Sequence, residues 1–192
     1  MKKNKAIILD RDGTLIEDKN YVYKIEDFEL LDGVIEGLKL LQNDFLFFIV
    51  TNQSGIGRGY YTVQDFQNFN NHLINVLRKQ NIEIQKTYFC PHLREDNCEC
   101  RKPKTKFIDE IIKEFNIDIK KSWMIGDHPS DIQFGLNEGC KTIFLTTGHG
   151  DKHIDELKFL GIKPNHICHD FYCATKRINE EFQKSKRNIY QL

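Results

Sequence analysis

The segment KAIILDRDGTL, from Lys5 to Leu15, decides the fold of this 192-residue chain. Its apolar run indicates a buried strand from Lys5 to Asp10, and a second acid, Asp12, follows two positions later. If the strand persists, the two carboxylates share one face, and Gly13 permits a sharp turn directly after them. The alternative is an ordinary polar turn after a strand. The favoured interpretation is a pair of carboxylates at the tip of a buried strand.

Strands and helices alternate along the rest of the chain. Further β-branched and aromatic runs predict strands at Phe45 to Asn52, Ile84 to Cys90, Ser122 to Asp127 and Thr142 to Thr147. Apolar residues at helical spacing predict helices around Val34 to Leu41, Phe66 to Leu77, Phe107 to Phe115 and Ile132 to Leu136. Thr62 and Asp65 form a capping-box pattern, and Gly139 fits a helix stop. The expected fold is α/β: a three-layer, Rossmann-like parallel sheet with helices on both faces and ligands at the carboxyl ends of the strands.

Size and composition favour one domain. A chain of 192 residues with 40% hydrophobic side chains can bury one sizeable core. We expect a single domain over residues 1–192, with a metal-binding loop at about 88–103 and a tail at about 176–192. That tail is expected to be either a last surface helix or a frayed end.

Charge and hydropathy limit the classes of binding partner that we expect. Twenty-eight basic and 28 acidic residues balance, so no global field attracts nucleic acid or an anionic membrane. No apolar run approaches the roughly 20 residues of a membrane span, and the start does not resemble a signal peptide. We expect a cytosolic protein, monomeric, with a small substrate and with neither nucleic acid nor membrane as partner.

Polar residues follow the other predicted strands. In IVTNQSG, Thr51, Asn52 and Ser54 offer hydroxyl and amide groups that suit phosphate oxygens, although an ordinary helix cap and turn would use the same residues. In CRKPK, Arg101 and Lys102 can neutralise phosphoryl charge. The sequence therefore places groups suited to phosphoryl transfer at several strand tips.

A magnesium site is expected among the acids. The segment MIGDHPSD brings Asp127 and Asp131 after another strand. Mg²⁺ prefers carboxylate oxygens and keeps several waters and a substrate phosphate oxygen. Asp10, Asp127 and the backbone carbonyl of Asp12 would meet that requirement.

A second metal pattern lies in CPHLREDNCEC. Cys90, His92, Cys98 and Cys100 form C-x-H-x5-C-x-C, the closed four-ligand set of a structural Zn²⁺ site. The alternative is a hairpin with incidental buried cysteines. Zinc without an open position would not catalyse, and we expect it to hold the loop that delivers the following basic residues.

In this order and spacing, DRDGT, TN, the lysine of CRKP and GDxxxD resemble the haloacid dehalogenase-like (HAD-like) phosphatases over nearly the whole chain. The resemblance implies that Asp10 is the nucleophile and that Asp12 protonates the leaving oxygen and then activates water. It implies that Thr51 and Lys102 hold the phosphoryl oxygens. The chain between DRDGT and the first predicted helix is too short for the folded cap domain of many relatives, so we expect an open site.

The Cys/His loop directly before CRKP resembles one subgroup, which contains D-glycero-D-manno-heptose 1,7-bisphosphate phosphatase and histidinol-phosphate phosphatase. NYVYKIEDFELLDGV and TNQSGIGRGYYT resemble the heptose enzyme, whereas CPHLREDNCECRKPK and GDHPSDIQ resemble the histidinol enzyme at least as well. We favour removal of the 7-phosphate, a step of bacterial ADP- or GDP-heptose synthesis for surface glycans such as lipopolysaccharide. Histidinol phosphate of histidine biosynthesis is the alternative.

The same resemblance implies a set of substrate contacts. They are Asp18, Lys19, Asn20, Tyr21, Asn52, Gln53, Ser54, Arg101 and His128. The subgroup usually carries Lys or Arg where this chain has His128, so a cationic contact there is in doubt or depends on pH. Tyr60 and Tyr61 are interpreted as helix-face core, and the Gly148–Gly150 segment as a strand-end turn with a possible contact from His149.

Three other functional classes fit the sequence less well. A phospho-accepting receiver domain lacks the second aspartate of DRDGT, and a zinc loop has no role there. A zinc-bearing binding module with relic motifs conflicts with the intact Asp10, Asp12, Lys102 and Asp127. Processing of nucleic-acid ends is disfavoured because no basic stripe interleaved with aromatics is present.

Overall fold

A computed structural model describes residues 3–189 of the chain. The strands are β1 (Ala6–Leu9), β2 (Leu46–Asn52), β3 (Ile84–Cys90), β4 (Trp123–Gly126), β5 (Lys141–Leu145) and β6 (His166–Cys168). The helices are α1 (Val34–Leu41), α2 (Ser54–Gly57), α3 (Val63–Lys79), α4 (Lys106–Phe115), α5 (Pro129–Asn137), α6 (Gly150–Phe159) and α7 (Phe171–Ile189), with short 3-10 turns at Ile25–Asp27 and Ile119–Lys121. All strand pairs are parallel, in the order β3-β2-β1-β4-β5-β6.

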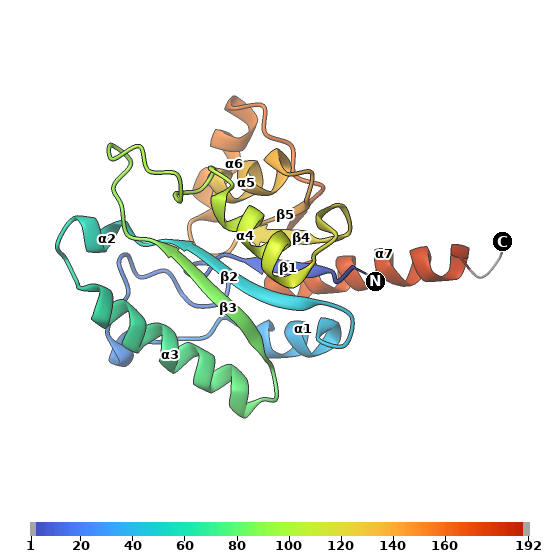
Figure 1. Cartoon of the computed structure of the whole chain (residues 1–192), viewed down its shortest axis with the longest axis horizontal. Coiled ribbons are helices and arrows are strands. Elements are labelled where there is room, and N and C mark those ends of the chain that lie inside the picture. The colour runs from blue at the N-terminus through green and yellow to red at the C-terminus, as the bar shows by residue number, and fades with distance from the viewer. Residues whose placement is uncertain (1–2, 190–192) are drawn as a thin grey trace.

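Side-chain alternation in β1 explains the three layers. Ile7 and Leu9 face one core cluster, and Ala6 and Ile8 face the other. The first cluster takes apolar residues from α1, α3 and α7, and the second takes them from α4 and α5. A small third cluster joins α5, β5 and α6 through Ile132, Phe144 and Leu157. Figure 1 shows α1 and α3 on one side of the sheet and α4, α5 and α6 on the other.

The predicted fold class is confirmed. The helices and strands that were not predicted are the four-residue helix α2, in a segment expected to be a loop, and two elements towards the carboxyl end. All five predicted strands and all four predicted helices are present within a few residues of their expected bounds. The α6 helix and the edge strand β6 were missed, because β6 is only three residues long and carries a half-exposed pattern. Of the two expectations for the tail, the helix is correct up to Ile189, and residues 190–192 lie outside the described part.

The topology locates the site. Strand order reverses between β1 and β4, and ligands of such sheets bind at that point outside the carboxyl ends of the strands. No cap domain follows β1: residues 10–33 form a loop with one 3-10 turn and two isolated bridges, Asp12 with Ile16 and Ile16 with Leu30. The β3–α4 loop also lies at the carboxyl ends of the strands, beside α2 (Figure 1).

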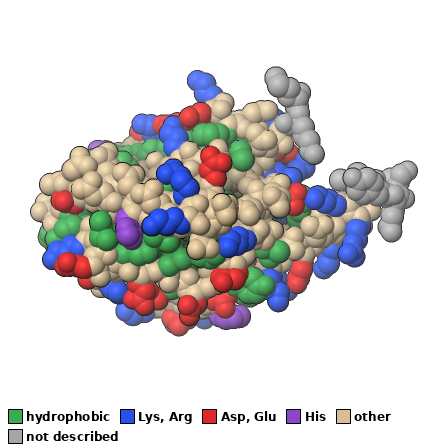
Figure 2. All heavy atoms as spheres, turned by 90° about the horizontal axis from the view of Figure 1, so that it is seen from below, with side chains coloured by type: hydrophobic (Ala, Val, Ile, Leu, Met, Phe, Trp, Pro, Cys, Tyr) green, Lys and Arg blue, Asp and Glu red, His purple; other side chains and the backbone are tan. Residues whose placement is uncertain are grey.

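The surface agrees with the balanced composition. On the face shown in Figure 2, Lys and Arg side chains and Asp and Glu side chains both occur across the surface, and neither sign forms a continuous stripe. Among the described residues, no helix is both long enough and apolar enough to span a bilayer.

Candidate active site

Lys102 sits between two carboxylates at the centre of the site. Its Nζ lies 2.7 Å from Asp10 Oδ1 and 2.7 Å from Asp131 Oδ1, and it also donates to the Val50 carbonyl at 2.7 Å. All three charged side chains are buried, so solvent hardly screens these contacts. Lys102 therefore has a fixed position beside one oxygen of Asp10.

The β2 tip anchors the loop that carries Lys102. Asn52 accepts from the Lys102 backbone N–H at 3.0 Å and donates to the Lys102 carbonyl at 3.3 Å. The Gln53 backbone N–H donates to the Cys90 carbonyl at 2.7 Å, which ties the start of α2 to the end of β3. The lysine thus reaches the acids across two neighbouring strands.

Asp12 is held by a network of donors rather than left free. Arg11, which is buried, donates through Nε to Asp12 Oδ2 at 3.1 Å and through a terminal nitrogen to Asp12 Oδ1 at 2.8 Å. Gln53 donates to Asp12 Oδ2 at 2.8 Å and to the Thr51 hydroxyl at 2.8 Å, while the Tyr61 hydroxyl donates to Gln53 at 2.6 Å. Both oxygens of Asp12 are therefore oriented by the protein.

Asp127 follows β4 and faces the turn after β1. Its Oδ2 accepts the His149 backbone N–H at 3.0 Å. Gly13 adopts a positive φ of 74°, and a Cβ there would lie 2.2 Å from that same oxygen. The Thr147 hydroxyl donates to the Gly13 carbonyl at 2.7 Å, so the β5–α6 loop is fixed against the β1 turn. Only glycine fits between the two strand tips.

Burial and mutual repulsion perturb the acids. Burial raises the pKa of Asp10 to about 6, although the Lys102 charge opposes the rise. Burial, with the charges of Asp10 and Asp131, raises the pKa of Asp127 to about 9. Burial alone would lower the pKa of Lys102, but the two facing carboxylates outweigh it and raise that pKa to about 12.

The single positive charge of Lys102 does not neutralise the three neighbouring carboxylates, so the cluster is suited to binding a divalent cation. Asp10, Asp127 and Asp131 each offer an oxygen, and these atoms lie within 4.8 Å of one another. Asp131 is already used, because its Oδ1 pairs with Lys102 and its Oδ2 accepts the His128 backbone N–H at 3.0 Å. Asp10 and Asp127 are therefore the better carboxylate ligands for Mg²⁺, which keeps its remaining positions for water and phosphate. With the Asp12 carboxylate turned to Arg11, the expected ligand from that residue is still its backbone carbonyl.

The second predicted metal set also converges. Four of its contacts, Cys90 Sγ to His92 Nδ1, Cys90 Sγ to Cys98 Sγ, His92 Nδ1 to Cys100 Sγ and Cys98 Sγ to Cys100 Sγ, span 3.3 to 3.6 Å. Tetrahedral Zn²⁺ with Zn–S near 2.3 Å and Zn–N near 2.0 Å places its ligand atoms roughly 3.5 to 3.8 Å apart, close to these distances. Although burial acts to raise it, the backbone N–H groups of Cys100 and Arg101 help lower the pKa of Cys98 to about 7. Burial raises the pKa values of Cys90 and Cys100. The spacing of the four ligand atoms therefore suits a tetrahedral metal ion, whose binding would displace the protons of those two thiols.

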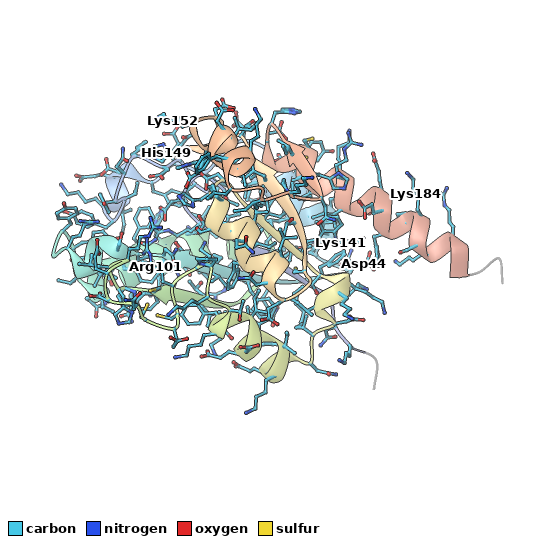
Figure 3. The ribbon with its side chains drawn as sticks, turned by 90° about the horizontal axis from the view of Figure 1, so that it is seen from above. Asp44, Arg101, Lys141, His149, Lys152 and Lys184 are labelled. Carbon is cyan, nitrogen blue, oxygen red and sulfur yellow. The ribbon has the colours of Figure 1, made fainter. Side chains whose placement is uncertain are left out.

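A cleft of about 320 Å³ opens over these groups. It brings together most of the predicted residues: Asp10, Asp12, Asp18, Asn20, Tyr21, Thr51, Asn52, Gln53, Ser54, Arg101, Lys102, Asp127 and His128. Figure 3 shows Arg101 and His149 on different elements. Lys19 differs from this set. Its Nζ lies 2.8 Å from Glu29 Oε2 and donates to the Asp27 carbonyl at 3.3 Å, and the side chain does not line the cleft. The structure gives no support to the predicted substrate contact of Lys19.

Two other predicted substrate contacts have their polar atoms used within the protein. Gln53 is 3% exposed and is bonded to Asp12, Thr51 and Tyr61. Asn52 is bonded to the Lys102 backbone on both sides of its amide. Both side chains line the cleft but are committed to positioning other residues.

His128 is exposed at the cleft edge and caps α5. Its Nδ1 lies 2.9 Å from the Ser130 hydroxyl and accepts the Ser130 backbone N–H at 3.1 Å. Loss of hydration around the ring and the facing His153 lower the pKa of His128 to about 4. The lowered pKa disfavours a cation at this position, where the subgroup usually carries Lys or Arg.

Three site residues were not singled out as such from the sequence. Arg11 gave no signal beyond its place between two acids. His149 lines the cleft, and its Nε2 lies 3.3 Å from Asp18 Oδ2, so it is more than a turn residue. Tyr61 is buried, as expected, but it precedes α3 and lines the cleft. Tyr60 is exposed, so its interpretation as helix-face core was wrong.

Comparison with known proteins agrees with this geometry. Residues 99–174 match the HAD-hydrolase-like family model. The chain is 49% identical to D-glycero-alpha-D-manno-heptose-1,7-bisphosphate 7-phosphatase of Campylobacter jejuni, covering 74% of this chain and 83% of that protein. It is 44% identical to the beta-heptose counterpart of Helicobacter pylori, covering 76% and 85%.

A solved structure gives the same result. D,D-heptose 1,7-bisphosphate phosphatase from B. bronchiseptica, complexed with magnesium and phosphate, matches with a TM-score of 0.83 at 27% identity, covering 92% of this chain and 99% of that chain. Together with the strand-tip acids and the buried lysine, these similarities establish that the chain belongs to the HAD-like phosphatases, in the family of D-glycero-D-manno-heptose 1,7-bisphosphate 7-phosphatases.

Proposed function

We propose that this protein is a magnesium-dependent phosphatase that removes the 7-phosphate of D-glycero-D-manno-heptose 1,7-bisphosphate through an aspartyl-phosphate intermediate. The observation that carries the proposal is the placement of Lys102 2.7 Å from one oxygen of Asp10, at the bottom of the cleft. That contact leaves the second oxygen of Asp10 available to phosphorus. The named activity of relatives that are 44 to 49% identical supports the choice of substrate.

In the first half-reaction, Asp10 attacks phosphorus, a bond forms between its free oxygen and phosphorus, and the bond to the sugar O7 breaks. Lys102 and the Thr51 hydroxyl lie where they can bind the non-bridging oxygens. The leaving oxygen takes a proton from Asp12. In the second half-reaction, Asp12 takes a proton from water, whose oxygen displaces Asp10 from phosphorus and releases inorganic phosphate.

The contacts of Asp12 bear on its double role. Arg11 and Gln53 donate to its oxygens and hold the carboxyl group beside the cleft, where it can give a proton to the leaving oxygen and later take one from water.

Two metal ions complete the proposal. Mg²⁺ held by Asp10, Asp127 and the Asp12 carbonyl would supply charge neutralisation and orientation of the phosphate. Zn²⁺ held by Cys90, His92, Cys98 and Cys100 would be structural, because four protein ligands leave no open position. The next residues after Cys100 are Arg101 and Lys102, so a zinc ion there would help Asn52 to hold the lysine in place.

The remaining expectations are also proposals: action in the cytoplasm, as a monomer, in the synthesis of nucleotide-activated heptose for bacterial surface glycans such as lipopolysaccharide. No nucleic-acid role is supported by the charge distribution. The relatives include enzymes named for each anomer, so the preferred anomer is a question for experiment.

The test is a comparison of substrates under one condition. Phosphate release is measured from both anomers of the heptose 1,7-bisphosphate and from histidinol phosphate, with Mg²⁺ present. We expect kcat/KM for one heptose anomer to exceed that for histidinol phosphate by about 100-fold or more. A preference for histidinol phosphate would assign the enzyme to histidine biosynthesis, and inactivity on all three would overturn both assignments.

A further inference from the structure

Three potential metal ligands lie together beside the catalytic cleft and outside the proposed chemistry. His128 precedes α5, and His153 and Glu156 stand three residues apart on α6, so they share one helix face. One ligand atom from each lies within 4.8 Å of the other two. Among the described residues, only two other groups, the Cys/His loop and the aspartate cluster, converge in the same way.

The contacts between the three side chains are close. His153 Nδ1 lies 2.7 Å from Glu156 Oε2, and the rings of His128 and His153 meet edge to face with centroids 4.4 Å apart. An ion between His153 and Glu156 would replace the shared proton and separate the two atoms to roughly 3.3 Å, the ligand spacing of a four-coordinate site. That shift is within the reach of two partly exposed side chains.

The third ligand has support of its own. In the structure His128 Nδ1 accepts the Ser130 backbone N–H at 3.1 Å, and the Ser130 hydroxyl lies 2.9 Å from the same nitrogen. Binding an ion through Nε2 requires the other tautomer, in which Nδ1 donates to that hydroxyl and gives up the backbone contact. A metal-bound histidine commonly donates its other ring N–H to such a partner, which fixes the orientation of the ring. Ser130 would therefore act in the outer shell of the site.

The location gives an ion access and an open position. His128 lines both the catalytic cleft and a neighbouring cavity of about 510 Å³, and Glu156 lines the second. Three protein ligands leave at least one position for water or for an oxygen of a bound anion. Arg94, Arg101 and Lys104 line the same cavity, which suits an anion.

We propose that His128, His153 and Glu156 form a binding site for a divalent transition-metal ion at the rim of the catalytic cleft, separate from the Mg²⁺ and cysteine sites. Two imidazoles and one carboxylate favour Zn²⁺, Ni²⁺ or Co²⁺ over Mg²⁺, which prefers oxygen ligands alone. The ion would link the α5 N-terminus to α6 and place positive charge beside the cleft. The site stands on these side chains and does not depend on which phosphate ester the enzyme hydrolyses.

The test uses the full chain purified without a histidine tag. The cysteine loop is first filled with Zn²⁺, excess metal is dialysed away, and saturating Mg²⁺ occupies the aspartates. Ni²⁺ uptake is then followed by calorimetric titration and equilibrium dialysis. The variants are His153→Ala, Glu156→Gln and the double variant, with His169→Ala as control because His169 is an exposed histidine paired with Asp170 elsewhere.

We expect the wild type and His169→Ala to bind one additional Ni²⁺ per chain. Each single variant should bind it about 10-fold or more weakly, and the double variant should lose it. Absence of additional uptake by the wild type, or equal uptake by the double variant, would overturn the proposal.

A measurement on the wild type guards against variants that fail to fold. Paramagnetic Ni²⁺ should broaden the imidazole NMR signals of His128 and His153 and leave those of His72 and His169 sharp. Equal broadening of all four would mean surface binding without a site, which contradicts the proposal.

Discussion

Asp131 illustrates a role that a single residue acquires only from its neighbours. One of its oxygens pairs with Lys102 and the other accepts the His128 backbone N–H. Asp131 therefore orients the lysine, and neither of its oxygens is left free to bind a metal ion. We predict that Asp131→Asn lowers kcat about 10- to 100-fold with little loss of fold, because Lys102 keeps Asp10 but loses its second anchor. Steady-state kinetics checks this, with Asp155→Asn on the exposed face of α6 as control. An unchanged kcat would mean that Asp10 and the Val50 carbonyl position the lysine without Asp131.

The raised pKa values predict how magnesium stabilises the protein. Without metal, the pKa of Asp10 rises from 3.8 to about 6 and that of Asp127 from 3.8 to about 9, so the native state binds protons more tightly than the unfolded chain. Stability of the metal-free protein therefore falls as pH rises through that window, from about 4 to 9. Mg²⁺ displaces those protons, so the Mg²⁺-induced rise in Tm should be larger at pH 8 than at pH 5. An equal rise at both pH values would contradict this assignment of the ligands.

At the scale of elements, the β3–α4 loop links the cysteine cluster to the catalytic lysine. We predict that Cys98→Ser has a large effect on kcat and only a small effect on the Tm of the protein. The loop that positions Lys102 loses its metal cross-link, whereas the sheet keeps its hydrophobic core. Cys140→Ser, which changes a buried cysteine outside this loop, is the matched control. Bound zinc is measured in parallel. Full activity of a zinc-free Cys98→Ser protein would show that the loop keeps its position without metal.

Some helices and strands could be predicted from the sequence and others could not. Strands with continuous apolar runs, such as β2, are evident from composition because both faces are buried. The β6 strand and α6 were missed because their burial depends on neighbours: α6 buries only Gly150 and Leu157, and its apolar pattern is weak. The acids and Lys102 could be predicted from motifs, whereas the partners of Arg11, Gln53 and His149 depend on contacts between residues distant in sequence.

At the scale of the whole molecule, α7 closes the fold by packing on α1 and the sheet. Ile178 is fully buried in the cluster that joins α1, α3 and α7. We predict that Ile178→Ala lowers the free energy of unfolding by about 2 to 4 kcal/mol, through lost burial and the cavity left behind. Ile167→Ala, on the half-exposed edge strand, should cost much less. Equal losses in urea denaturation would mean that α7 does not complete the core.

The proposed reaction takes place in the cleft at the carboxyl ends of the strands, which no cap domain covers in the part of the chain that the structure describes. The most direct test of that reaction follows D-glycero-D-manno-heptose 1,7-bisphosphate by phosphorus NMR, with Mg²⁺ and with Asp10→Asn as the inactive control. The account predicts that the wild type converts the 7-phosphate signal into inorganic phosphate and leaves the 1-phosphate signal intact, while the control is slower by at least about 1,000-fold. Loss of the 1-phosphate first, or turnover by Asp10→Asn at a comparable rate, would contradict it.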